Sequence, residues 1–443
     1  MLQGELFMGF LQKRLIIIGL LFLGLSSAAF GEGGDLDAIT STTGPQSQPI
    51  AIPSLEDTGS YGEQITQVLA DDLTRFGLFK LVDRNAYIDD NSFSERPNFG
   101  DWRAINAPFL VKGKVIEDGN KITVQYRLWD VFQEKQKIGL EHTADATAWR
   151  KIAHTMADAI YKQVIGEEGY FNSRIVYIAE SGPEENLKRR LSIMDQDGAN
   201  HAYLTDGSSL VLTPRFSPAL QEITYISYES GEPKVYLLDI ATGRREVLGA
   251  FEGMTFAPRF SPDGNEVVMS QAVDGETNIF RVNLRSGERT QLTQGDAIDT
   301  APCYSPDGKQ IVFESDRDGT QQLYIMDVDG QNIRRISYGK GRYATPVWSP
   351  KGDLIAYTRI YGGKFYIGVI QPDGSNDRLL TKDYLVEGPT WSPNGRIIAF
   401  TRQSSTSAPR KLYAIDITGF FEREIETPVN ASDPAWSSNA VSY

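Results

Sequence analysis

Residues 302–308 read Pro-Cys-Tyr-Ser-Pro-Asp-Gly, and they contain one of six copies of the motif Pro, any residue, aromatic, Ser. The copies begin at Pro214, Pro258, Pro302, Pro346, Pro389 and Pro434, at steps of 44, 44, 44, 43 and 45 residues. A period of this size is typical of proteins in which one supersecondary unit is repeated. We therefore expect the C-terminal part of the chain to be built from equivalent units.

Each unit reads as four short strands. In the copy at Pro302, residues 305–308 (Ser-Pro-Asp-Gly) have the composition of a type I turn. The alternating run 311–315 predicts a second strand, 323–326 a third and 334–337 a fourth. Four antiparallel strands in about 40 to 45 residues form a blade of a β-propeller.

The two ends of the repeat region complement each other. The second-strand pattern recurs six times from Ile175 onward, but no copy of the motif precedes Ile175, whereas the copy at Pro434 has almost nothing after it. We therefore expect residues 434–437 to supply the first strand of the blade that begins at Arg174. This pairing closes a ring of six blades and leaves no free sheet edge. The alternative, an open solenoid, would need polar end caps, and none is visible in the sequence.

The N-terminus has the layout of a secretory signal. Lys13 and Arg14 precede the apolar run 15–25, which is too short to span a bilayer, and small residues follow. We expect a signal peptide over 1–31, cleavage after Ala29 or Gly31, and a start at Met1 or Met8. The alternative is a retained helix that anchors the chain in a membrane. The signal reading places the mature protein in an extracytoplasmic space.

Residues 32–170 differ in texture from the repeats, and we expect them to form an α/β domain that precedes the propeller of residues 171–443. A strand is predicted at 49–53, and Ser60 with Glu63 predicts a capping box for a helix that stops at Gly77. A strand at 78–82 follows, then a polar loop, then a hairpin over 109–128. A last helix runs from Trp149 to a stop at Gly166. The fold class is thus an α/β N-terminal domain followed by an all-β six-bladed β-propeller.

Charge and cysteine content narrow the choice of partners. The formal net charge is −14, which argues against nucleic acid or anionic lipid as a partner. Cys303 is the only cysteine, so the chain has no internal disulfide and no lipid-anchoring cysteine after the apolar run. Cys303 lies in a repeat position occupied elsewhere by Arg, Val, Thr or Ala, and we expect it to pack in the blade.

The combination of these features resembles the TolB family of the Tol-Pal system. The junction 166–177 (GEEGYFNSRIVY) resembles the family's segment between its two domains, and 48–53 (QPIAIP) resembles its first core strand. The propeller repeat alone also occurs in other families, whereas its combination with the N-terminal domain is specific.

This resemblance implies a non-enzymatic periplasmic adaptor that needs no cofactor. It implies that one face of the propeller binds the Pal lipoprotein and that a flexible N-terminal segment binds the C-terminal domain of TolA. The implied role is in outer-membrane invagination during cell division and in outer-membrane integrity. The protein would be a monomer, peripheral to membranes through its partners only. In this chain the TolA segment corresponds to Asp35, Leu36, Asp37, Ala38, Ile39, Thr40 and Ser41.

An enzyme is the rival interpretation. A serine hydrolase needs Gly-x-Ser-x-Gly, but the stretch 207–210 lacks the closing Gly. A metal-dependent hydrolase of the lactonase type needs several ligands that converge on the channel, whereas two of the three histidines, His142 and His154, precede the ring. The Asp-x-Asp-Gly triplets at Asp195, Asp316 and Asp327 have Gly at position 4, unlike an EF-hand loop, and predict turns. We expect no catalytic or metal-binding residues.

The strand order decides which loops share a face of the ring. The tight turns after first and third strands lie on one side, and the variable loops after second strands lie with the links between blades on the other, as binding loops on a rigid scaffold do. The links carry seven acidic residues against three basic ones. The residues that we expect to bind Pal there are Met254, Thr255, Phe256, Asp299, Thr300, Arg342, Tyr343 and Glu387.

Overall fold

The computed structural model describes residues 46–57, 59–88, 92–93, 96–248 and 253–438. The predicted signal peptide and the predicted TolA segment, Asp35 to Ser41, lie outside the described residues. In the described part of the chain, none of the helices combines the length and the apolar character that a bilayer span requires.

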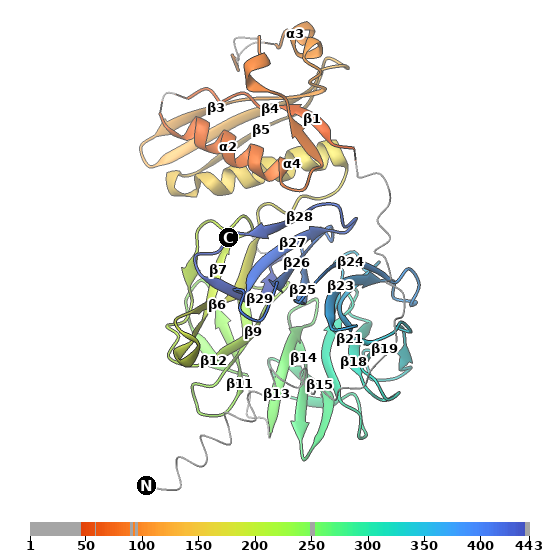
Figure 1. Ribbon diagram of the computed structural model, residues 1–443. Coiled ribbons are helices and arrows are strands. Elements are labelled where there is room, and N and C mark those ends of the chain that lie inside the picture. Colours follow the sequence, from red (N-terminus) through yellow and green to blue (C-terminus); the bar gives the residue numbers. More distant parts are fainter. Residues whose placement is uncertain (1–45, 58, 89–91, 94–95, 249–252, 439–443) are drawn as a thin grey trace. The chain divides into compact units, whose positions relative to one another are not determined.

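The N-terminal domain is a mixed five-stranded sheet with helices on it. The strands are β1 (Gln48–Ala51), β2 (Phe79–Leu81), β3 (Phe109–Asp118), β4 (Lys121–Asp130) and β5 (Lys135–Asp145), in the order β2-β1-β3-β4-β5. β1 pairs in parallel with β2 and β3, and the other neighbours are antiparallel. The helices are α2 (Tyr61–Thr74), α3 (Phe99–Ala104) and α4 (Trp149–Ile165), and single 3₁₀ turns span Arg84–Ala86 and Ala146–Ala148. Figure 1 shows α2 and α4 side by side on one face of the sheet.

Apolar residues at helical spacing position α2 and α4. Ile65 and Leu69 of α2 and Met156 and Ile160 of α4 are fully buried in one cluster with the inward residues of the sheet. Burial of such a side chain contributes about 1.5–3 kcal/mol. The predicted stop of α4 at Gly166 is confirmed, because this residue caps the helix in the left-handed conformation.

The predicted capping box of α2 is wrong. Ser60 occupies the N-cap position, but its side chain makes no capping hydrogen bond. Asp57 accepts the hydrogen bond of the Gly62 N–H instead, at 2.7 Å. The carboxylate of Glu63 is held by Ser54 and Arg84. Asp57 thus takes the capping role predicted for Ser60, and Arg84 binds the carboxylate of Glu63.

The described residues of the repeat region form six four-stranded sheets, which confirms the six-bladed propeller (Figure 1). The first two blades hold β9 (Val211–Phe216), β10 (Glu222–Ser227), β11 (Lys234–Asp239) and β12 (Arg245–Val247), then β13 (Met254–Phe260), β14 (Glu266–Val273), β15 (Glu276–Asn283) and β16 (Arg289–Gln291). The next two hold β17 (Asp299–Tyr304), β18 (Gln310–Ser315), β19 (Gln322–Asp327) and β20 (Arg334–Arg335), then β21 (Arg342–Trp348), β22 (Ile355–Tyr361), β23 (Lys364–Ile370) and β24 (Arg378–Asp383). The fifth holds β25 (Leu385–Trp391), β26 (Ile397–Gln403), β27 (Lys411–Asp416) and β28 (Glu422–Ile425).

The sixth blade joins the two ends of the repeat region. Its order is β29-β6-β7-β8, with β29 at Asn430–Trp436, β6 at Arg174–Ser181, β7 at Lys188–Asp195 and β8 at Ala202–Tyr203; a 3₁₀ turn at Glu184–Asn186 links β6 to β7. β29 is antiparallel to β6, with Trp436 opposite Ile175. The Arg174 N–H donates to Ser437 Oγ at 2.9 Å, and the Ser437 N–H donates to the Arg174 carbonyl at 2.8 Å. The first strands of the six blades contact one another in sequence around the ring, including β29 with β9.

Every first strand contains the same backbone irregularity. The residue before the motif proline has a positive φ, and the register against the second strand shifts there. These six residues are Thr213, Ala257, Ala301, Thr345, Gly388 and Asp433, with φ between 46° and 63°. A left-handed conformation costs a residue other than glycine about 1–2 kcal/mol. Since it recurs in all six blades, the bulge belongs to the repeat.

The N-terminal domain contacts the tight-turn end of the propeller. Asp72 of α2 accepts a hydrogen bond from Gln196 in the turn after β7, at 2.9 Å. Arg150 of α4 pairs with Asp197 in the same turn. Asn394, in the turn after β25, donates to the Glu168 carbonyl at 3.0 Å. All three of these contacts involve turns that follow a first or a third strand.

His154 lies at the centre of this contact. Its Nδ1 is 2.6 Å from Asp72 Oδ2, and its Nε2 is 3.9 Å from Asp195 Oδ2 and 4.0 Å from Asp197 Oδ2. Burial of the imidazole lowers its pKa, but the surrounding carboxylates, Asp72 above all, outweigh burial and raise the pKa above 6.5. The charged imidazolium therefore stabilises the folded state.

We predict that removal of the closing strand destabilises the whole ring. Deletion of 430–443 leaves the β6 edge unpaired and removes the buried Trp436, so the free energy of unfolding should fall by several kcal/mol. Denaturant titration of the mature protein measures this change. Deletion of 439–443 alone, which keeps β29, is the matched control. Equal stability of the two truncated proteins would contradict the role of β29.

We predict that His154→Gln lowers stability more at acidic than at alkaline pH. Because the folded pKa is raised, the contribution of His154 is fully present below its unfolded pKa of about 6.5 and is lost as the pH rises through the folded value. One pKa unit corresponds to about 1.4 kcal/mol. Unfolding free energies of both proteins at pH 5.5 and pH 9 check this. His142→Gln is the control with the opposite slope, because burial lowers the pKa of His142; parallel pH profiles of wild type and His154→Gln would contradict the prediction.

Candidate partner-binding end of the propeller

The residues predicted to bind Pal meet at one end of the ring. Met254, Thr255 and Phe256 open β13, Asp299 and Thr300 open β17, Arg342 and Tyr343 open β21, and Glu387 lies near the start of β25. Because consecutive first strands contact one another, these starts surround the same mouth of the central channel. This mouth, formed by the links between blades, is called the link end below.

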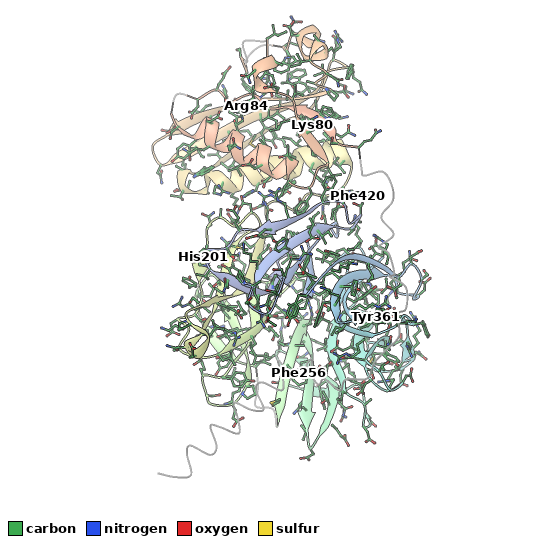
Figure 2. The ribbon with its side chains drawn as sticks, viewed as in Figure 1. Lys80, Arg84, His201, Phe256, Tyr361 and Phe420 are labelled. Atoms are coloured by element: carbon green, nitrogen blue, oxygen red, sulfur yellow. The ribbon has the colours of Figure 1, made fainter. Side chains whose placement is uncertain are left out.

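The eight residues differ in accessibility. Met254, Phe256, Arg342 and Glu387 are partly exposed, and Figure 2 labels Phe256 on β13. Thr255 and Thr300 are buried, and the exposed fractions of Asp299 and Tyr343 are both 0%. The link end therefore offers only part of the predicted set to a partner directly.

Asp299 is held inside its blade by an ion pair. Both of its carboxylate oxygens accept hydrogen bonds from Arg317 Nη2, at 3.0 Å each. The Arg317 guanidinium in turn lies over the rings of Phe313 and Tyr324, at 5.3 and 5.0 Å. A charge-assisted pair of this kind fixes the loop after β18 to the start of β17. A charge reversal at Asp299 would break this buried pair.

Tyr343 is likewise part of the framework. Its ring packs against Tyr357 at 4.9 Å, and both hydroxyls donate to Asp377. Arg359 lies over the Tyr343 ring at 5.1 Å. Burial raises the pKa of Tyr343, so the hydroxyl remains a donor at every physiological pH. The link before β21 is therefore rigidly positioned.

Glu387 gives the link end a titratable group. Burial, together with the charges of Asp433 and Glu180, raises its pKa to about 7, although Arg410 acts in the opposite direction. Asp433 is also raised in pKa by burial, and it accepts a hydrogen bond from the Thr213 backbone. Glu180 is held by Arg189 at 3.0 Å and by Arg410 at 3.5 Å. These acids lie where β25, β29 and β6 come together.

Two exposed apolar residues at the link end were missed by sequence reasoning. Ile298, in the link before β17, is 42% exposed, and Tyr338, in the link before β21, is 73% exposed. Large exposed side chains of this kind form the centres of protein interfaces. Because both residues lie in links that differ between blades, the sequence could have indicated them as exposed apolar residues at this end.

A metal centre is poorly supported at the contact with the N-terminal domain. Among the described residues, Asp72, His154 and Asp197 form the one group of possible ligands whose donor atoms lie within 4.8 Å of one another. Arg75 lies 3.3 Å from Asp72 and 3.8 Å from Asp197, and Arg150 also pairs with Asp197. The chain itself thus supplies the cations that these carboxylates need.

Comparisons with known proteins agree with this architecture. Residues 39–137 match the TolB amino-terminal domain, and residues 161–440 match the TolB beta propeller domain. The Tol-Pal system protein TolB of Paramagnetospirillum magneticum is 56% identical over 215 residues, which cover 47% of this chain and 48% of that protein. The matched stretch thus spans about half the length of this curated relative.

A solved structure matches nearly the whole chain. TolB from Acinetobacter baumannii superposes with a TM-score of 0.80 at 26% identity, over 91% of this chain and 99% of that one. The family is non-enzymatic, which is what the resemblance implied, and it is a periplasmic component of the Tol-Pal system. With both of its domains matched, the chain belongs to the TolB family.

Proposed function

We propose that this protein is a periplasmic adaptor that binds the Pal lipoprotein at the link end of the propeller and the C-terminal domain of TolA through residues 35–41. In this role it takes part in outer-membrane invagination during cell division and in outer-membrane integrity. The secretory signal over 1–31 delivers the chain to the periplasm, where it acts as a monomer.

The observation that carries the proposal is the division of the propeller into two ends. The N-terminal domain engages the turn end through Asp72, Arg150 and Glu168. The link end has the exposed apolar side chains of Ile298 and Tyr338 and the partly exposed side chain of Phe256. A rigid mouth with apolar side chains and neighbouring acids suits a protein partner with apolar and basic or amide-rich loops.

The structure sharpens the choice of residues for a test. Asp299 and Tyr343 are buried in ion-pair and hydrogen-bond networks, so their substitution would disturb folding and binding together. Ile298 and Tyr338 reach the surface at the same end without such buried pairs, and Glu387 is partly exposed there. They are the better probes of an interface.

We predict that Tyr338→Ala and Ile298→Ser each weaken Pal binding at least tenfold, which corresponds to about 1.4 kcal/mol. Glu387→Lys should weaken binding as well, by replacing an acid with a base at the mouth. Isothermal titration of the mature protein with the soluble domain of Pal measures this. Leu220→Ser is the matched control, since Leu220 is 48% exposed in a turn after a first strand, at the other end. Unchanged binding by all three link-end variants would refute the assignment of this end.

We predict that the TolA-binding segment is separable from the Pal surface. Deletion of 32–43 should abolish binding to the TolA domain and leave the affinity for Pal within about twofold, because the segment and the link end belong to different parts of the chain. Pull-down and titration with each purified partner check both statements. TolA binding that survives the deletion would show that another surface carries it.

A further inference from the structure

Two arginines occupy equivalent positions on adjacent first strands. Arg215 of β9 and Arg259 of β13 each follow the motif proline, and these two strands contact each other. The same position holds Cys303, Val347, Thr390 and Ala435 on the other four first strands. Among the six positions that follow a motif proline, the two basic residues therefore lie on neighbouring strands.

Neither guanidinium has a carboxylate partner. Within the described ranges, no carboxylate oxygen lies within 4.0 Å of Arg215 or Arg259. Arg215 Nη1 donates to the carbonyl of its own neighbour Pro214 at 2.6 Å, while Arg215 Nε is buried without an acceptor. None of the described residues accepts a hydrogen bond from the Arg259 side chain. Most other partly buried arginines of the propeller are paired, as Arg317 is with Asp299 and Arg396 with Asp416.

Nearby groups compensate the charge of this pair only in part. Burial lowers the pKa of both arginines. The charge of Arg259 lowers the pKa of Arg215 further, whereas the thiol of Cys303 on β17 acts in the opposite direction on both. The charge of the Asp433 carboxylate acts on Arg215 and favours its charged form, but among the described residues no ion pair within 4.0 Å joins the two side chains. Two like charges held together in partial burial are costly unless an anion accompanies them.

We propose that Arg215 and Arg259 form a binding site for a small oxyanion in the central channel of the propeller. The planar guanidinium group presents paired N–H donors that match the oxygens of carboxylate, phosphate or sulfate. The bound anion supplies the acceptor that Arg215 Nε and the Arg259 guanidinium lack. The six-fold repeat provides this site only between β9 and β13, where both positions are basic.

The acids of the link end do not occupy the same level of the channel. Glu387 and Asp433 precede or coincide with the left-handed residue of their strands, whereas Arg215 and Arg259 follow the proline. The first strands run from the link end to the turn end, so the arginine pair lies deeper toward the turns. The channel thus has an acidic mouth and a basic interior.

The test measures stabilisation of the full mature chain by sodium phosphate, sulfate and acetate against sodium chloride at constant ionic strength. We expect a saturable rise of a few degrees in the midpoint of thermal unfolding with an oxyanion and not with chloride. Equal effects of acetate and phosphate would assign the site to carboxylates and phosphates alike, and an effect of phosphate and sulfate alone would assign it to tetrahedral anions.

Neutral variants locate the effect. Arg215→Gln and Arg259→Gln should weaken phosphate binding at least tenfold, whereas Arg285→Gln, which removes an exposed arginine from a turn between β15 and β16, should respond as wild type. If either neutral variant fails to fold, the single cysteine gives an independent readout on the wild type. Saturating phosphate should slow alkylation of Cys303 by iodoacetamide severalfold, and chloride should not. No saturable effect of any oxyanion on wild type, or equal effects on wild type and both variants, would overturn the proposal.

Discussion

The pairing of β29 with β6 is the interaction on which the rest of the propeller depends. A blade is a twisted antiparallel sheet that buries both faces against its neighbours, so an incomplete ring exposes apolar faces at two ends. The pair joins residues 263 positions apart, through reciprocal hydrogen bonds between Arg174 and Ser437. Trp436, whose Nε1 donates to Ser173 Oγ at 2.8 Å, fills the space beneath this seam. The closed ring then fixes the six first strands around one channel, and every candidate site on the propeller follows from that arrangement.

The seam also connects the propeller with the N-terminal domain. Trp436 contacts Tyr170, whose ring packs against Phe171 and Phe76, so the closing strand shares a core with the helices. The polar part of the contact is the network around His154. The apolar cluster stabilises the contact by burying surface, and the hydrogen-bonded charges beside it fix the orientation of the two domains. Three polar contacts of the N-terminal domain with the ring are made to turns, at the end opposite the starts of the first strands.

Much of this could be predicted from the sequence because the repeat is regular. The number of blades, the strand that closes the ring and two of the three helices of the N-terminal domain follow from spacing and periodicity alone. β5 was missed because its residues are mostly exposed and few of them are apolar, and α3 because its six residues follow a polar, proline-bearing loop. The burial of Asp299 was missed since its partner, Arg317, is brought back only by the loop after β18. The proximity of Arg215 and Arg259, 44 residues apart in the sequence, exists only once neighbouring blades pack.

The residue with a positive φ in each first strand is a part of the repeat that is conserved in backbone conformation but not in residue type. The six residues at this position are two threonines, two alanines, a glycine and an aspartate, so the residue types do not predict the positive φ. Thr345 is held by a hydrogen bond from its N–H to Glu314 and by a 2.8 Å contact with Thr358, while Asp433 N–H donates to Thr401. In these two blades the same backbone conformation is held by different side chains of the preceding blade. What the repeats share at this position is a backbone conformation and the hydrogen bonds that stabilise it. A substitution there is tolerated if the new residue can adopt a positive φ, whether or not its side chain resembles the original one.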